Sequence, residues 1–219
     1  MTEAEWLACT DSFDMLLFLH EKASDRKLRL FACAYVREGW HLLADERSRR
    51  SVEIAEQHAD GLSDDASLDR ACDEADDAIS NSRELFLNSG KGEVEGRAFE
   101  GSCAAHWVAV EEAWEAALQQ LHWHFIEDES TIQSALLHDI IGNPFRTATI
   151  TPEMLNWHGG LLVSMAQRMY DSYDFTDVPI LADALEEAGC TNADILNHCR
   201  QPGEHVRGCW VIDLLLGKE

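Results

Sequence analysis

Apolar side chains recur at intervals of three and four residues along almost the whole chain, which places them on one face of an α-helix. Stretches in which apolar and polar residues alternate, as in a half-buried β-strand, are nearly absent. The pattern therefore predicts an all-α fold, a compact multi-helix bundle of about nine or ten helices. The expected helices cover residues 11–23, 25–40, 45–59, 63–88, 99–126, 130–141, 154–173, 177–188, 195–200 and 204–216.

The longest apolar stripe lies in residues 99–126 and predicts one continuous helix that contributes a face to the core. Segment 154–173 contains the pair Gly159–Gly160, which an α-helix tolerates at a cost of about 1 kcal/mol per glycine. The glycine-rich residues 89–92 interrupt the pattern most clearly and predict a loop or hinge. We therefore expect a single helical domain over residues 1–219, with a looser boundary near 89–92.

The composition supports a folded, soluble protein. The chain has 219 residues, of which 46% are hydrophobic, and its seven tryptophans provide enough apolar area to offset the backbone entropy lost on folding. No apolar run approaches the roughly 20 residues that span a bilayer, and the acidic start MTEAEWLACTDSF differs from a secretory signal. We expect a cytoplasmic protein without a membrane partner.

The charge is strongly negative and unevenly distributed. The chain has 41 acidic and 17 basic residues, a formal net charge of −24, so its field repels nucleic-acid phosphates. Residues 61–130 alone carry seventeen acidic and four basic residues, which is more than half of the excess. This region is either a solvated helix face or a docking surface for a basic protein partner.

Four sulfur and nitrogen ligands lie close together near the end of the chain, at Cys190, Cys199, His205 and Cys209. On the predicted helix 204–216, His205 and Cys209 are four residues apart and therefore share a face. The Pro202–Gly203 turn can fold Cys199 back toward them, which gives a tetrahedral Cys3His zinc site. The sequence favours packed thiols with a histidine at the helix terminus over this zinc site, because the C-x2-C spacing of most structural zinc sites is missing.

Two catalytic interpretations have less support. Cys209 before Trp210 resembles the nucleophile of papain-like proteases, but it falls about five residues inside the predicted last helix, beyond the useful part of the helix dipole. His122 and His124 precede three acidic residues, yet on a helix they point about 200° apart. Glycine-rich phosphate loops, Gly-x-Ser-x-Gly and His-Glu-x-x-His are absent from the sequence.

Several longer motifs resemble an uncharacterised bacterial protein family that is expanded in planctomycete-type genomes. They are LHDIIGNPFR (137–146), VPILADALEEAGC (178–190) and NHCRQPGEHVRGCWVIDLLLGKE (197–219). The segments MTEAEWLACTD and ASDRKLRLFACA (23–34) are similar to the N-terminus of that family. The resemblance implies kinship but no particular reaction.

The sequence as a whole favours a non-enzymatic, acidic helical module for interaction or regulation, because no complete catalytic constellation is present. The first alternative is a helical protein with a structural zinc ion on Cys190, Cys199, His205 and Cys209. The second is a metal-dependent hydrolase or redox enzyme that uses His122 or His124. The favoured interpretation requires no cofactor, and zinc is the cofactor of the first alternative.

Overall fold

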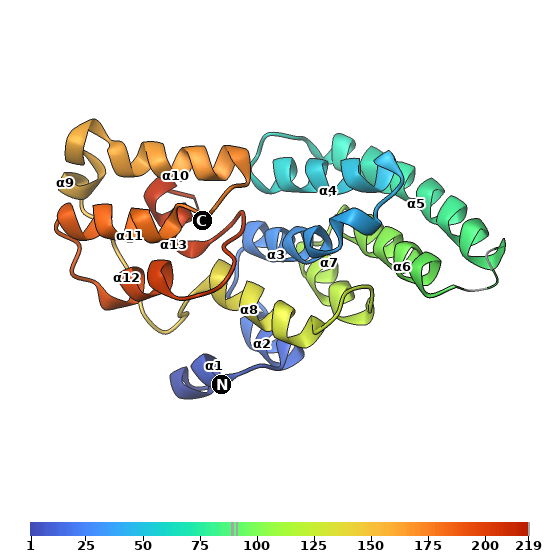
Figure 1. Ribbon diagram of the computed structural model, residues 1–219, viewed down its shortest axis with the longest axis horizontal. Coiled ribbons are helices and arrows are strands. Elements are labelled where there is room, and N and C mark those ends of the chain that lie inside the picture. Colours follow the sequence, from blue (N-terminus) through green and yellow to red (C-terminus); the bar gives the residue numbers. More distant parts are fainter. Residues whose placement is uncertain (89, 91, 219) are drawn as a thin grey trace. The chain divides into compact units, whose positions relative to one another are not determined.

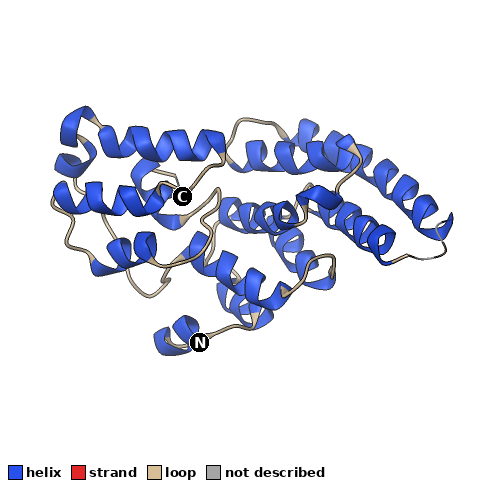
Figure 2. Ribbon diagram, in the orientation of Figure 1, coloured by secondary structure: helices blue, strands red, loops and turns tan. Residues whose placement is uncertain are grey.

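The computed structural model describes residues 1–88, 90 and 92–218, and its regular structure is entirely helical over this part of the chain (Figure 2). The predicted all-α fold is confirmed. The described residues form thirteen α-helices, whereas the sequence predicted nine or ten. None of these helices has both the length and the apolar character needed to cross a membrane. The hinge predicted at 89–92 lies partly outside the described residues.

Contacts between Cα atoms divide the chain into two compact units. Unit 1 comprises Met1–Ala8 and Ala135–Glu219, and unit 2 comprises Cys9–Ser134. Neither limit falls at residues 89–92, where the sequence favoured a looser boundary. That the chain forms one domain stays a prediction, and the two units are described separately below.

Unit 2 is organised around helix α3, which packs against α4 and α7, while α5 packs against both α4 and α6 (Figure 1). Helix α8, Glu129–Ile141, begins in unit 2 and ends in unit 1. The remaining helices of unit 2 are α2 (Ser12–Leu19), α3 (Asp25–Glu38), α4 (Glu46–Ala59), α5 (Asp65–Asn88), α6 (Glu93–Trp107) and α7 (Ala113–Gln119), with 3-10 turns at Trp40–Leu42 and Gln120–His122.

Helix α3 begins where the Ser24 side chain accepts a hydrogen bond from the backbone N–H of Lys27. All residues from 28 to 36 are buried, so the helix is covered on every side. One of them is charged: Arg29 is only 3% exposed. A buried guanidinium requires hydrogen-bond acceptors, and backbone carbonyls between α6 and α7 supply them.

The prediction of one continuous helix over 99–126 is wrong, because α6 and α7 are separate helices. The Arg29 guanidinium donates hydrogen bonds to three backbone carbonyls in the connection between them. The acceptors are the carbonyls of Val108, Val110 and Glu111, at N···O distances of 2.9, 2.7 and 2.6 Å. Since these carbonyls have a partner outside the helix, the chain turns here without leaving buried polar groups unpaired.

Unit 1 surrounds an apolar core in which α10 packs against α11 and α13, and α12 packs against α11 and α13. Its core residues include the leucines and alanines of α10 and α11 and three buried cysteines. In addition to the end of α8, the helices of unit 1 are α1 (Glu3–Ala8), α9 (Pro152–Leu155), α10 (Leu161–Ser172), α11 (Val178–Glu187), α12 (Ala193–Arg200) and α13 (Trp210–Leu216), with a 3-10 turn at Trp157–Gly159.

The helix predicted over 154–173 is also wrong as a single element. Gly159 and Gly160 do not continue a helix, because they adopt φ values of 72° and 87° in the left-handed region. The chain reverses at this pair, so that α9 and α10 are distinct helices.

The C-terminal end of α8 is fixed by two tryptophans. Gly142 follows the helix with a φ of 69°, and its carbonyl accepts a hydrogen bond of 2.9 Å from the indole Nε1 of buried Trp6. A Cβ atom on Gly142 would lie 2.8 Å from the Trp210 ring. Glycine is therefore required here both by backbone conformation and by packing.

Gly142→Ala is expected to destabilise unit 1 by about 3 kcal/mol, since left-handed strain and overpacking each cost about 1–3 kcal/mol. Thermal and urea unfolding followed by circular dichroism measures this change. Gly159→Ala is the matched control, because Gly159 has a similar φ of 72° but open space around its Cα. Equal destabilisation by the two variants would contradict the role assigned to the contact with Trp210.

The last helix begins at Trp210, whereas the sequence predicted it from residue 204. The backbone N–H of Val206 donates to Asp139 Oδ2 at 3.0 Å. Residues 201–209 form a loop, and Cys209 is the N-cap residue of α13. The prediction that Cys209 lies five residues inside a helix is wrong.

Candidate metal centre

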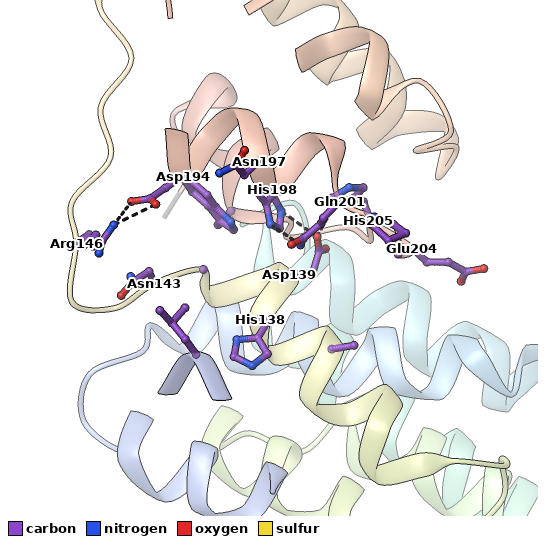
Figure 3. A pocket seen from close by; sticks show the side chains of 16 residues that line it. His138, Asp139, Asn143, Arg146, Asp194, Asn197, His198, Gln201, Glu204 and His205 are labelled. Atoms are coloured by element: carbon purple, nitrogen blue, oxygen red, sulfur yellow. Dashed lines mark hydrogen bonds and ion pairs between the residues drawn. The ribbon is translucent and has the colours of Figure 1, made fainter. Parts of the chain in front are cut away.

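Helix α8 places a carboxylate inside unit 1. Asp139 is 5% exposed and follows the buried Leu136 and Leu137 on the same helix. Its Oδ1 lies 2.6 Å from His205 Nδ1 and 3.1 Å from His198 Nε2. The three side chains point toward one another at one end of a pocket (Figure 3).

Two further elements complete the cluster. His198 comes from the last turn of α12, and its Nε2 lies 3.3 Å from Cys209 Sγ. Cys209 Sγ also lies 3.7 Å from His205 Nδ1. Helix α8, helix α12 and the loop that precedes α13 thus each contribute side chains to the cluster.

The four ligand atoms of Asp139, His198, His205 and Cys209 all lie within 4.8 Å of one another. In a tetrahedral zinc site with metal–nitrogen and metal–oxygen distances of about 2.0–2.1 Å and a metal–sulfur distance of about 2.3 Å, ligand atoms are separated by roughly 3.3–3.6 Å. The distances of 3.1, 3.3 and 3.7 Å are close to these values. The distance of 2.6 Å between Asp139 Oδ1 and His205 Nδ1 is shorter, because a hydrogen bond joins these two atoms.

The electrostatics of the cluster suit a divalent cation. Burial opposes ionisation of Asp139, but hydrogen bonds to His198 and His205 outweigh this effect and hold the pKa of its carboxyl below the usual range. Burial and the nearby Asp139 raise the pKa of the Cys209 thiol well above its usual value. A divalent metal on the ionised Asp139 and Cys209 and two neutral imidazoles gives a site with no net charge, which burial favours.

The structure brings together two of the four residues that the sequence proposed as zinc ligands, His205 and Cys209. Cys190 and Cys199 lie in the apolar core of the same unit, 3% and 0% exposed. Burial, together with the charges of Asp139 and Cys190, raises the pKa of Cys199 to about 12. These two cysteines are buried thiols outside the converging group.

Sequence reasoning did not identify Asp139 or His198 as ligands. Asp139 lies between apolar residues in the segment LHDII, and a carboxylate on the buried face of a helix requires a partner. His198 precedes Cys199 on a helix whose buried residues include both. The sequence thus indicates that Asp139 and His198 are buried polar residues. It does not indicate which side chains they contact in the folded protein.

Within the described part of the chain, no other group of three or more potential ligands converges in this way. His122 and His124 do not belong to such a group, and His124 Nδ1 instead lies 2.5 Å from Glu129 Oε1. In unit 2, Cys72 Sγ lies 3.7 Å from His106 Nδ1, but this pair has no third ligand.

In comparisons with known proteins, the chain matches no family model, no curated protein and no solved structure at a significant level.

Proposed function

We propose that this protein binds one zinc ion in unit 1 through Asp139, His198, His205 and Cys209. The observation that supports the proposal is the convergence of one oxygen, two nitrogens and one sulfur within 4.8 Å of one another in a buried place. Buried polar groups of this kind need partners, and a metal ion provides one for all four at once.

The donor set favours zinc over other biological cations. Ca²⁺ and Mg²⁺ prefer six or more oxygen ligands, whereas this cluster offers a single carboxylate. Imidazole nitrogen and thiolate sulfur are typical zinc ligands, and four protein ligands satisfy its tetrahedral preference. The proposed set differs from Cys190, Cys199, His205 and Cys209 in that a carboxylate and an imidazole replace two thiolates, which leaves the loaded site neutral instead of negative.

A metal at this position joins segments that are far apart in the sequence. Asp139 lies in the last turn of α8 and His198 in the last turn of α12, whereas His205 and Cys209 lie in the loop before α13. The free energy of metal binding then contributes to the stability of unit 1, because the unfolded chain has no preformed site.

Cobalt substitution tests this proposal. The full chain, purified without a histidine tag, is titrated with Co²⁺ and followed by absorbance. We expect saturation at one equivalent, intense d–d bands typical of four-coordinate cobalt, and a charge-transfer band from one thiolate. Weak octahedral bands without the thiolate band would contradict the proposed ligand set.

Gln201 is expected to orient His198 for metal binding. Gln201 Nε2 lies 3.2 Å from His198 Nδ1, and a half-turn of the amide brings Oε1 to the same place. There it accepts the Nδ1 proton, which leaves Nε2 free to bind the metal.

Gln201→Leu should therefore weaken Co²⁺ binding by about 10–100-fold, as is usual when a partner of a metal-bound histidine is removed. Gln201→Glu keeps an acceptor and should retain the affinity. Asn197→Ala is the control, because Asn197 is an exposed side chain on the same helix. Competition titrations against a chelating indicator measure all three, and an unchanged affinity in Gln201→Leu would exclude the positioning role.

A further inference from the structure

The proposed metal centre lies beside a pocket of about 500 Å³ in unit 1. Asp139, His198 and His205 belong both to the ligand cluster and to the lining of this pocket (Figure 3). Cys209 does not line the pocket and instead belongs to the apolar core, with 0% exposure. An ion held by the four residues would thus have sulfur on its core side and oxygen and nitrogen ligands on its pocket side.

We infer that the metal is reached from this pocket and takes a small, uncharged molecule as an additional ligand through a carbonyl oxygen. This inference rests on the proposed function. Because the four protein ligands already complete a tetrahedron, the additional ligand makes the metal five-coordinate. Three of the four ligands line the pocket, which leaves this face of the metal accessible to it.

The charges around the pocket do not favour an anion. Among the described residues that line it, Arg146 is the only lysine or arginine, and Glu204 adds a carboxylate. Its Nη1 lies 3.2 Å from Asp194 Oδ2, and its Nε lies 2.5 Å from Glu3 Oε1, so two carboxylates already balance its charge. Because the loaded metal centre is itself neutral, no unbalanced positive charge faces the pocket.

The rest of the lining suits an uncharged polar molecule. The side chains of Asn197 and Gln201, on and just after α12, offer amide donors and acceptors, and Trp210 provides an apolar wall. Most of the residues that line the pocket are polar or charged, so the wall offers hydrogen-bond partners to a small polar molecule. A metal that binds a carbonyl oxygen polarises it, so amides and esters are the substrate class that this arrangement fits.

The experiment uses the full chain loaded with one equivalent of Co²⁺ and acetamide, a small carbonyl compound that stays uncharged when its oxygen binds a metal. We expect a saturable loss of d–d intensity as the coordination number rises, with cobalt retained after gel filtration. Acetate, which is similar in size but anionic, should bind at least tenfold more weakly. Unchanged bands, release of the cobalt, or tighter binding of acetate would each overturn the inference.

Asn197 lines the pocket and is not one of the four ligands, so Asn197→Trp is expected to narrow the pocket. We expect the cobalt spectrum of this variant to be unchanged and its affinity for acetamide to fall at least tenfold. Equal affinity would mean that the compound does not reach the metal through the pocket. Failure of Co²⁺ to bind at all would contradict the proposed function. If Co²⁺ binds but its spectrum does not change when the compound is added, only this inference is contradicted.

Discussion

Replacing Cys209 by serine is expected to lower the affinity of the protein for Co²⁺ by about 10³-fold, which is roughly 4 kcal/mol. The thiol is the only sulfur in the converging group, and a hydroxyl is a much poorer ligand for cobalt and zinc. The charge-transfer band of the thiolate should disappear in the same variant. Absorbance titration against a competing chelator measures both effects.

Cys199→Ala is the matched control for this variant. Both cysteines are 0% exposed and belong to the same apolar core, but only Cys209 lies with Asp139, His198 and His205. The control should bind Co²⁺ with unchanged affinity and an unchanged spectrum. Loss of binding in Cys199→Ala would contradict the proposed ligand set and favour the Cys3His site that the sequence suggested. Circular dichroism of the metal-free variants distinguishes loss of a ligand from loss of the fold.

Replacing Arg29 by methionine should destabilise unit 2 by about 3–5 kcal/mol. Three backbone carbonyls accept hydrogen bonds from this guanidinium, and methionine leaves them buried without a donor. Each unpaired carbonyl costs about 1–3 kcal/mol, and relief from burying the charge offsets part of the total. The free energy of unfolding in urea measures the change.

Arg50→Met controls for the loss of a positive charge. The Arg50 side chain is 63% exposed, and its Nε lies 4.0 Å from Glu74 Oε2. This variant should change the stability by less than about 0.5 kcal/mol. If Arg29→Met were equally mild, the connection between α6 and α7 would not depend on the guanidinium.

Local signals in the sequence were sufficient for the fold class and for many helix starts. Helices were expected over 11–23, 25–40 and 45–59, and the side chains of Asp11, Ser24 and Asp45 accept backbone N–H groups at the first turns of α2, α3 and α4. Such caps involve residues two or three positions apart, so the information lies within a short segment.

Two of the errors occurred where a side chain far away in the sequence contacts the backbone, whereas the helix predicted over 154–173 is interrupted by the local conformation of Gly159 and Gly160. The segment 99–126 has a helical apolar stripe, but Arg29, about 80 residues earlier, binds the carbonyls at its interruption. The loop before α13 likewise depends on Asp139, 67 residues away from Val206 in the sequence. Periodicity describes which face is buried and contains no information about such partners.

The same limit applies to the candidate site. His205 and Cys209 were recognisable because they lie four residues apart near other cysteines. Their nearness in space arises from the loop around Asp139 and not from the helical face that the spacing suggested. His198 and Asp139 join them only through the packing of α8 and α12, which spacing along the chain does not predict.

The predicted docking of a basic partner on the acidic region stays a prediction. Part of the charge of α5 already interacts with α4, since Asp77 and Glu74 lie 3.9 and 4.0 Å from Arg47 and Arg50. Other carboxylates of this helix, such as Asp69 and Asp73, are exposed. Binding that weakens steeply with salt would support a docking role for them.

Elemental analysis tests the central claim most directly. The full chain is expressed without a histidine tag, purified without chelators, incubated with zinc and passed through a desalting column. The account predicts about one equivalent of zinc per chain, lost in the variant Cys209→Ser and retained in Cys199→Ala. Less than about 0.1 equivalent of any transition metal in the wild-type protein would contradict it.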